Sequence, residues 1–67
     1  MADRVPFSEV HPGDRITFDG GHYLTGVVAD SIGTYSGMRL VGFRADGDDR
    51  VRCIAYAAHR SVIVHGG

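Results

Sequence analysis

The 67-residue sequence contains no lysine, no tryptophan and a single cysteine, Cys53. One cysteine excludes an intramolecular disulfide and fits a reducing compartment. No apolar run is long enough for a transmembrane helix, and the first ten residues contain no stretch that suits a signal peptide. We therefore expect a cytoplasmic chain that makes no contact with membranes.

The chain is short and nearly neutral. Ordering 67 residues costs roughly 100 kcal/mol, which a small core barely offsets, so the core is expected either to be efficient or to be completed by a second chain. The net charge of −1 gives no overall attraction to nucleic acid or anionic lipid. All seven basic residues are arginine, which favours a GC-rich coding genome, such as that of an actinobacterium or one of its phages; selection for planar donors is the alternative.

Alternating apolar residues, ten glycines and the lack of helical periodicity predict an all-β fold. Extended segments are expected at residues 15–19, 23–31, 38–45, 50–57 and 61–65. Turn signals separate them at residues 11–14 and 46–49, a loop is expected at 32–37, and Gly26 and Gly42 suit bulges or bends. Five short strands with these spacings indicate a small five-stranded β-barrel over residues 12–67.

Residues 1–11 are expected to form an N-terminal arm. Phe7 and Val10 are candidates for pinning this arm to the body, with one helical turn at Ser8 and Glu9. In the fourth segment Val51, Cys53 and Ala55 alternate with Arg50, Arg52 and Ile54, which is the pattern of a strand face that packs into the core.

The order of strands and turns resembles a Src-homology-3-like (SH3-like) barrel. The opening "PGDRITFDGG…TGVV" is similar to KOW and Tudor-type barrels, and "RVRCIAYAAHRSVIVH" resembles the last two strands of Sm-like proteins. No helix is expected before the first strand, and the loop lacks the Sm family's asparagine, so the Sm RNA-binding residues are not carried over. The resemblance implies a small SH3-like or Sm-like barrel.

The candidates for chemistry are Gly20-Gly21, the histidines and Cys53. Gly20-Gly21 is followed by an extended segment without lysine, which indicates a hairpin turn rather than a phosphate loop. The histidines lack the close pairing of zinc ligands, so neither a metal nor another cofactor is expected. No catalytic constellation accompanies Cys53, and we expect no enzymatic activity. The residues of the kinds that bind zinc are His11, His22, His59, His65 and Cys53.

Two function hypotheses remain open at this point. Runs of β-branched residues make both faces of two strands apolar, which predicts a protein partner or a homo-oligomer. The predicted interface residues are Val62, Ile63, Val64 and Val27. The alternative is a barrel that binds single-stranded nucleic acid through arginines and tyrosines, although nearby acids would repel phosphate. The predicted nucleic-acid contacts are Arg39, Arg44, Arg50, Arg52, Tyr23 and Tyr35, with Tyr56 as a further stacking surface.

Overall fold

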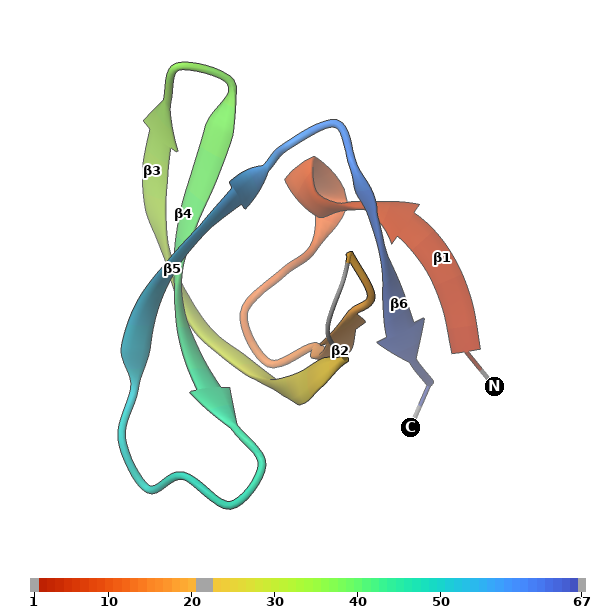
Figure 1. Cartoon of the computed structure of the whole chain (residues 1–67), viewed down its shortest axis with the longest axis vertical. Helices are drawn as coiled ribbons and strands as arrows, with labels where there is room; N and C mark the ends of the chain where they lie inside the picture. The colour runs from red at the N-terminus through yellow and green to blue at the C-terminus, as the bar shows by residue number, and fades with distance from the viewer. Residues whose placement is uncertain (1, 21–22, 67) are drawn as a thin grey trace.

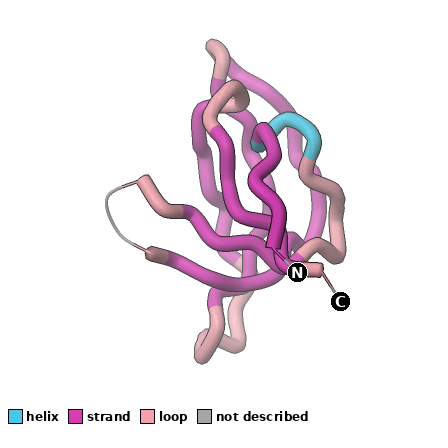
Figure 2. The backbone as a smooth tube through the Cα atoms, turned by 90° about the vertical axis from the view of Figure 1, so that its right-hand side faces the viewer, coloured by secondary structure: helices cyan, strands magenta, loops and turns pink. Residues whose placement is uncertain are grey.

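A computed structural model describes residues 2–20 and 23–66 and shows a sheet of six antiparallel strands (Figure 1). The strands lie in the order β1-β6-β2-β3-β4-β5. The elements in chain order are β1 (Ala2–Pro6), η1 (Phe7–Glu9), β2 (Arg15–Phe18), β3 (Leu24–Tyr35), β4 (Met38–Ala45), β5 (Arg52–Ala57) and β6 (Ser61–His65). The helical turn η1 is three residues long, and no helix in the described ranges is long and apolar enough to cross a membrane (Figure 2).

The all-β prediction is confirmed, but the expected five-stranded barrel is not. Within the described residues β1 and β5 form the two edges of one open sheet, which is not closed into a barrel. The sixth strand comes from the segment expected to be an arm. β1 pairs with β6 from Ala2 opposite His65 to Pro6 opposite Ser61, so this segment belongs to the sheet.

One side of the curved sheet carries the core. Phe18 lies at its centre, with ring centroids 5.3 Å from Phe7, 5.2 Å from Phe43 and 4.8 Å from Tyr56. Phe7 and Val10 are 0% and 1% exposed, which confirms that they pin the N-terminal segment. The buried hydrophobic residues are Phe7, Val10, Ile16, Phe18, Val28, Val41, Phe43 and Val62.

The turns follow the sequence signals with one exception. At residues 11–14 the N–H of Asp14 donates to the carbonyl of His11 over 3.1 Å, and Gly13 has φ +95°. The expected loop at 32–37 is wrong, because β3 continues to Tyr35 and only Ser36 and Gly37 form the turn into β4 (Figure 1). Both turn residues have positive φ, which suits a two-residue hairpin turn.

Neither Gly26 nor Gly42 is the extra residue of a bulge, because both irregularities lie in β3 beyond Gly26 and the first of them is opposite Gly42 of β4. Register shifts occur in β3 between Val28 and Asp30 and between Ser31 and Gly33. Gly26 pairs regularly with Ala45, and a Cβ there would lie 2.7 Å from the Ala45 Cα. Gly26 therefore permits close approach of β3 to β4 rather than a bulge.

Strand β5 presents the opposite face to the one expected. Cys53 and Ala55 are exposed, whereas Ile54 and Tyr56 pack against the core. The register explains this orientation, because Ile54 lies opposite the fully buried Val41 of β4. The prediction that Val51, Cys53 and Ala55 form a core face is therefore wrong.

Candidate interaction surface

The side of β3, β4 and β5 that faces away from the core carries a group of uncharged side chains. In β4, alternate residues Val41 and Phe43 are buried, so the intervening positions point outward. Their register partners in β3 and β5 point the same way. We call this surface the outer β3–β5 face, and its members are Tyr35, Met38, Leu40, Val51, Cys53, Ala55 and Ala57.

Much of the outer β3–β5 face is accessible to solvent. Tyr35 is 77% exposed, Val51 57% and Met38 36%. Asp30 is the charged residue nearest to the middle of this face, and it lies opposite Gly42 in the register of β3 and β4. A Cβ on Gly42 would lie 3.0 Å from Cγ1 of Val51 and closer still to Asp30, so this glycine leaves room for both side chains.

The predicted interface residues divide between the two sides of the sheet. Val62 is fully buried and Val64 packs against the core, so neither supplies an outer apolar surface. This corrects the prediction for these two valines: they alternate with Ile63 and lie on the core side of the sheet, where Phe7 and Val10 are also buried. Ile63 and Val27 are half-buried on the outer side of the sheet.

The predicted nucleic-acid contacts do not form one surface. Arg39 is only 9% exposed, and its Nη1 donates to the carbonyls of Phe7 and Val10, both over 2.6 Å. Its guanidinium carbon also lies 5.5 Å from the centroid of the Phe7 ring. The pairing of β4 with β5 is uninterrupted at Gly42, so Arg39 points inward and anchors the N-terminal segment instead of facing solvent.

The remaining arginines of that set occupy separate places. Arg44 is exposed on the outer side of β4, opposite Val27. Arg52 is turned to the other side and its Nε donates to Asp48 over 2.8 Å. Arg50 lies in the turn before β5, and its N–H also donates to Asp48. Tyr23 is 81% exposed in the connection before β3.

Three exposed ion pairs shift the pKa values of their carboxylates. Hydrogen bonds from Arg4, Arg15 and Arg52 lower the pKa of Asp19, Asp46 and Asp48 below the usual 3.8, and desolvation opposes each shift. The same contacts raise the arginine pKa values. The arginine charges involved are thus already balanced by acids, which reduces their attraction to phosphate.

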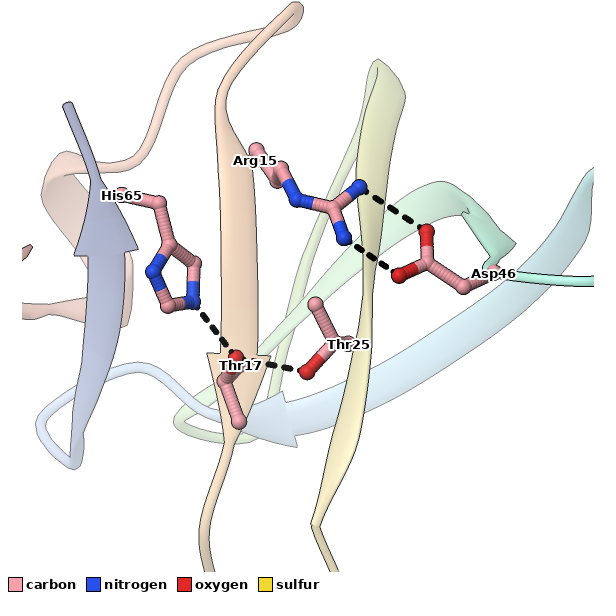
Figure 3. Close-up of polar contacts among 5 residues, drawn as sticks. All are labelled: Arg15, Thr17, Thr25, Asp46 and His65. Carbon is pink, nitrogen blue, oxygen red and sulfur yellow. Dashed lines mark hydrogen bonds and ion pairs between the residues drawn. The ribbon is translucent and has the colours of Figure 1, made fainter. Parts of the chain in front are cut away.

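A polar network covers the outer side of β2, β3 and β6 (Figure 3). Oγ1 of Thr17 lies 2.7 Å from Oγ1 of Thr25 and 2.7 Å from Nε2 of His65, and Arg15 donates two hydrogen bonds to Asp46. A hydroxyl beside an imidazole is the unit of nucleophilic catalysis. Thr17 is 6% exposed, however, and no pocket is present in the part of the chain that the structure describes. These contacts tie three strands together.

The histidines that the structure describes, His11, His59 and His65, are not gathered with Cys53 into a metal site. Across residues 2–20 and 23–66 there is no group of three or more His, Cys, Asp or Glu side chains that could hold a metal ion. His22 and Gly21, which belong to the metal candidates and to the expected glycine turn, lie outside the described residues. Cys53 is an exposed thiol on the outer β3–β5 face.

Comparison with known proteins adds no identification. No protein-family model, no curated protein and no solved structure matches this chain.

Sequence reasoning missed the outer β3–β5 face as a surface. The signal was present in the fourth segment, where both alternating sets contain apolar residues: Val51, Cys53 and Ala55 on one side, Ile54 and Tyr56 on the other. The larger side chains of the second set fill more core volume, and this difference in size distinguishes the two faces. Met38 was missed because its segment was judged by strand pattern alone, and Tyr35 was assigned to a loop and predicted only as a nucleic-acid contact.

Proposed function

We propose that this chain is a small, non-enzymatic protein-interaction module that self-associates through the β5 side of its sheet. The observation that carries the proposal is the uncharged, exposed row of Val51, Cys53 and Ala55 at the edge of the sheet. Contiguous exposed apolar surface on a sheet is a feature of protein contact sites. The small core of eight residues also supports completion by a second chain.

We further infer that the sheet is an opened relative of the SH3-like or Sm-like barrel. The support is backbone contact between the N-terminal segment and the corner after β5. The N–H of Phe7 donates to the carbonyl of Arg60 over 2.8 Å, and that of Ser8 to the carbonyl of Ala58 over 3.0 Å. These bonds bring the sheet close to closure and leave the middle of β5 as a free edge.

Substitution of Val51 tests the proposed function. We expect the wild-type chain to behave as a dimer or larger assembly in sedimentation equilibrium, and Val51→Asp to shift it toward the monomer mass. Val51 is more than half exposed, so a carboxylate there desolvates only on association and leaves the fold intact.

Ile63→Asp is the matched control, because Ile63 lies on the outer side of the distant strand β6, next to Arg4 of β1. We expect this variant to remain associated. A wild-type mass equal to that of one chain at all concentrations would refute self-association. Dissociation by Ile63→Asp, with Val51→Asp unaffected, would move the interface to β6.

A second candidate function is binding of single-stranded nucleic acid. Its support is the pair of exposed tyrosines, Tyr23 and Tyr35, together with the exposed arginines Arg44 and Arg50. This function predicts a mobility shift that weakens steeply with salt and is reduced by Tyr35→Ala. No shift with single-stranded DNA or RNA at low salt would exclude it.

A further inference from the structure

The sequence contains two Asp-Gly steps, Asp19-Gly20 and Asp46-Gly47. In both of them the aspartate is held in an ion pair by an arginine from a distant part of the chain. An Asp-Gly step is where a polypeptide isomerises most readily, because glycine has no side chain to keep its nitrogen away from the preceding carboxyl group. The two ion pairs therefore involve the carboxylates that are chemically most reactive toward their own backbone.

The step Asp46-Gly47 lies in the turn between β4 and β5. The N–H of Asp48 donates to the carbonyl of Ala45 over 3.0 Å, and Gly47 has φ +84°. This combination is a type II turn with Asp46 and Gly47 at its two central positions. Among the described residues the N–H of Gly47 donates to no backbone carbonyl, so its nitrogen is available for reaction.

Arg15 holds both oxygens of the Asp46 carboxylate (Figure 3). Its Nη1 donates to Oδ1 over 2.9 Å, and its Nη2 donates to Oδ2. The hydrogen bonds from Arg15 lower the pKa of Asp46, so less of this carboxyl group is protonated at neutral pH. Reaction with the next nitrogen needs the protonated carboxyl, because the departing oxygen leaves as water. Arg15 thus keeps the group ionised and also holds the oxygen that must leave.

We propose that Asp46-Gly47 is a site of spontaneous isomerisation to isoaspartate and that Arg15 controls its rate. The nitrogen of Gly47 attacks Cγ of Asp46: the N–Cγ bond forms, the Cγ–OH bond breaks, and the hydroxyl leaves with the amide proton as water. Water then cleaves either C–N bond of the cyclic imide. Cleavage at Cγ restores aspartate, whereas cleavage at the main-chain carbonyl carbon gives isoaspartate. The main chain then runs through Cγ, which lengthens the turn between β4 and β5.

Asp46-Gly47 is expected to react faster than Asp19-Gly20. The side chain of Asp46 is 50% exposed, against 18% for Asp19. The space beside Gly20 is also occupied, because a Cβ there would lie 2.8 Å from the hydroxyl oxygen of Tyr56. An imide therefore has less room to form at Asp19-Gly20.

Removal of Arg15 tests the proposal. We expect Arg15→Gln to accelerate isoaspartate formation at Asp46 about two- to fivefold in the folded protein at neutral pH, because an exposed ion pair that must open before reaction slows it by a factor of this size. Trypsin cuts after Arg44 and Arg50, so peptide 45–50 is obtained from both chains. Isoaspartate in this peptide is measured by methyl transfer from S-adenosylmethionine with an isoaspartate-specific methyltransferase, and fragmentation in the mass spectrometer assigns it to residue 46.

Arg52→Gln is the matched control, because Arg52 forms an ion pair with Asp48 in the same turn. We expect this variant to isomerise at Asp46 at the wild-type rate. Equal acceleration by both substitutions would mean that general loosening of the turn sets the rate, and would overturn the role of Arg15.

Measurement in urea separates the ion pair from the intrinsic reactivity of the step. Unfolding removes the pair, so the wild type and Arg15→Gln are expected to react at one rate, faster than that of the folded wild type. Circular dichroism checks that Arg15→Gln is folded in the native assay. A wild-type chain that reacts no faster in urea contradicts protection by Arg15, and absence of isoaspartate at residue 46 from both folded chains overturns the site.

Discussion

Removal of the Arg39 guanidinium is expected to destabilise the fold more than removal of any exposed arginine. In Arg39→Ala the carbonyls of Phe7 and Val10 lose their 2.6 Å hydrogen bonds and remain covered by protein. Hydrogen bonds from charged donors contribute about 1.5–3 kcal/mol each, and the stacking of the guanidinium on Phe7 adds about 0.5–1 kcal/mol. The free energy of unfolding should fall by about 3.5–7 kcal/mol.

This loss is large for a domain of this size. At about 0.05–0.15 kcal/mol per residue, the total stability of a 67-residue chain is about 3–10 kcal/mol. We expect the thermal midpoint of Arg39→Ala to fall by more than about 10 °C in circular dichroism. Arg39→Lys keeps the charge without the two-armed donor, so its midpoint should lie between those of Arg39→Ala and the wild type.

Arg44→Ala is the matched control for this measurement. Arg44 lies on the same strand, is exposed on its outer side, and makes no hydrogen bond through its side chain within the described residues. Its removal should change stability by no more than about 0.5 kcal/mol. Equal thermal midpoints for Arg39→Ala and Arg44→Ala would refute the structural role of Arg39. Arg39 would then again be a candidate for contact with nucleic acid.

Three further predictions concern the turn, a glycine contact and the acid response. Ser36 has φ 53°, so Ser36→Gly should raise the free energy of unfolding in urea by about 0.5–1 kcal/mol; a decrease would contradict the turn geometry. Gly26→Ala places a Cβ 2.8 Å from the Phe43 ring and should cost about 1–3 kcal/mol in the same assay, and an unchanged midpoint would show that the strands can separate freely. The pKa of Asp46 is lowered, so its contribution to stability is complete above the ordinary value of 3.8 and is lost as pH falls through the lowered pKa. Arg15→Gln should raise the pKa of Asp46 in a carboxyl NMR titration, because it removes the guanidinium that donates to this carboxylate. An unchanged titration of Asp46 would contradict the ion pair.

Local sequence signals were sufficient for much of the sheet. Segments 38–45 and 61–65 coincide with β4 and β6, because alternating β-branched and aromatic residues are bounded there by glycine- and aspartate-containing turns. Strand β1 escaped prediction because ADRVP has no apolar alternation. Its strand conformation comes from pairing with β6, which lies at the other end of the chain.

The candidate surface was harder to predict than the fold. Which face of a strand is buried depends on its register with a distant partner, and in β5 the contact of Ile54 with Val41 decides it. Both alternating sets of β5 are apolar enough to face a core, so periodicity alone gives no answer. The burial of Arg39 was not predicted either, because an arginine side chain is buried only where it finds hydrogen-bond acceptors. Here the acceptors are the carbonyls of Phe7 and Val10, which lie far from Arg39 in the sequence.

Amide hydrogen exchange at Ala55 is the most direct test of self-association through β5. The N–H of Ala58 donates to Gly37 beside β4, and antiparallel bonding alternates along a strand, so the N–H of Ala55 points away from β4. We predict that its exchange slows as the protein concentration is raised through the micromolar range, while the amide of Tyr56, which bonds toward β4, is protected throughout. If Ala55 exchanges equally fast in dilute and concentrated samples, the chain does not self-associate through β5.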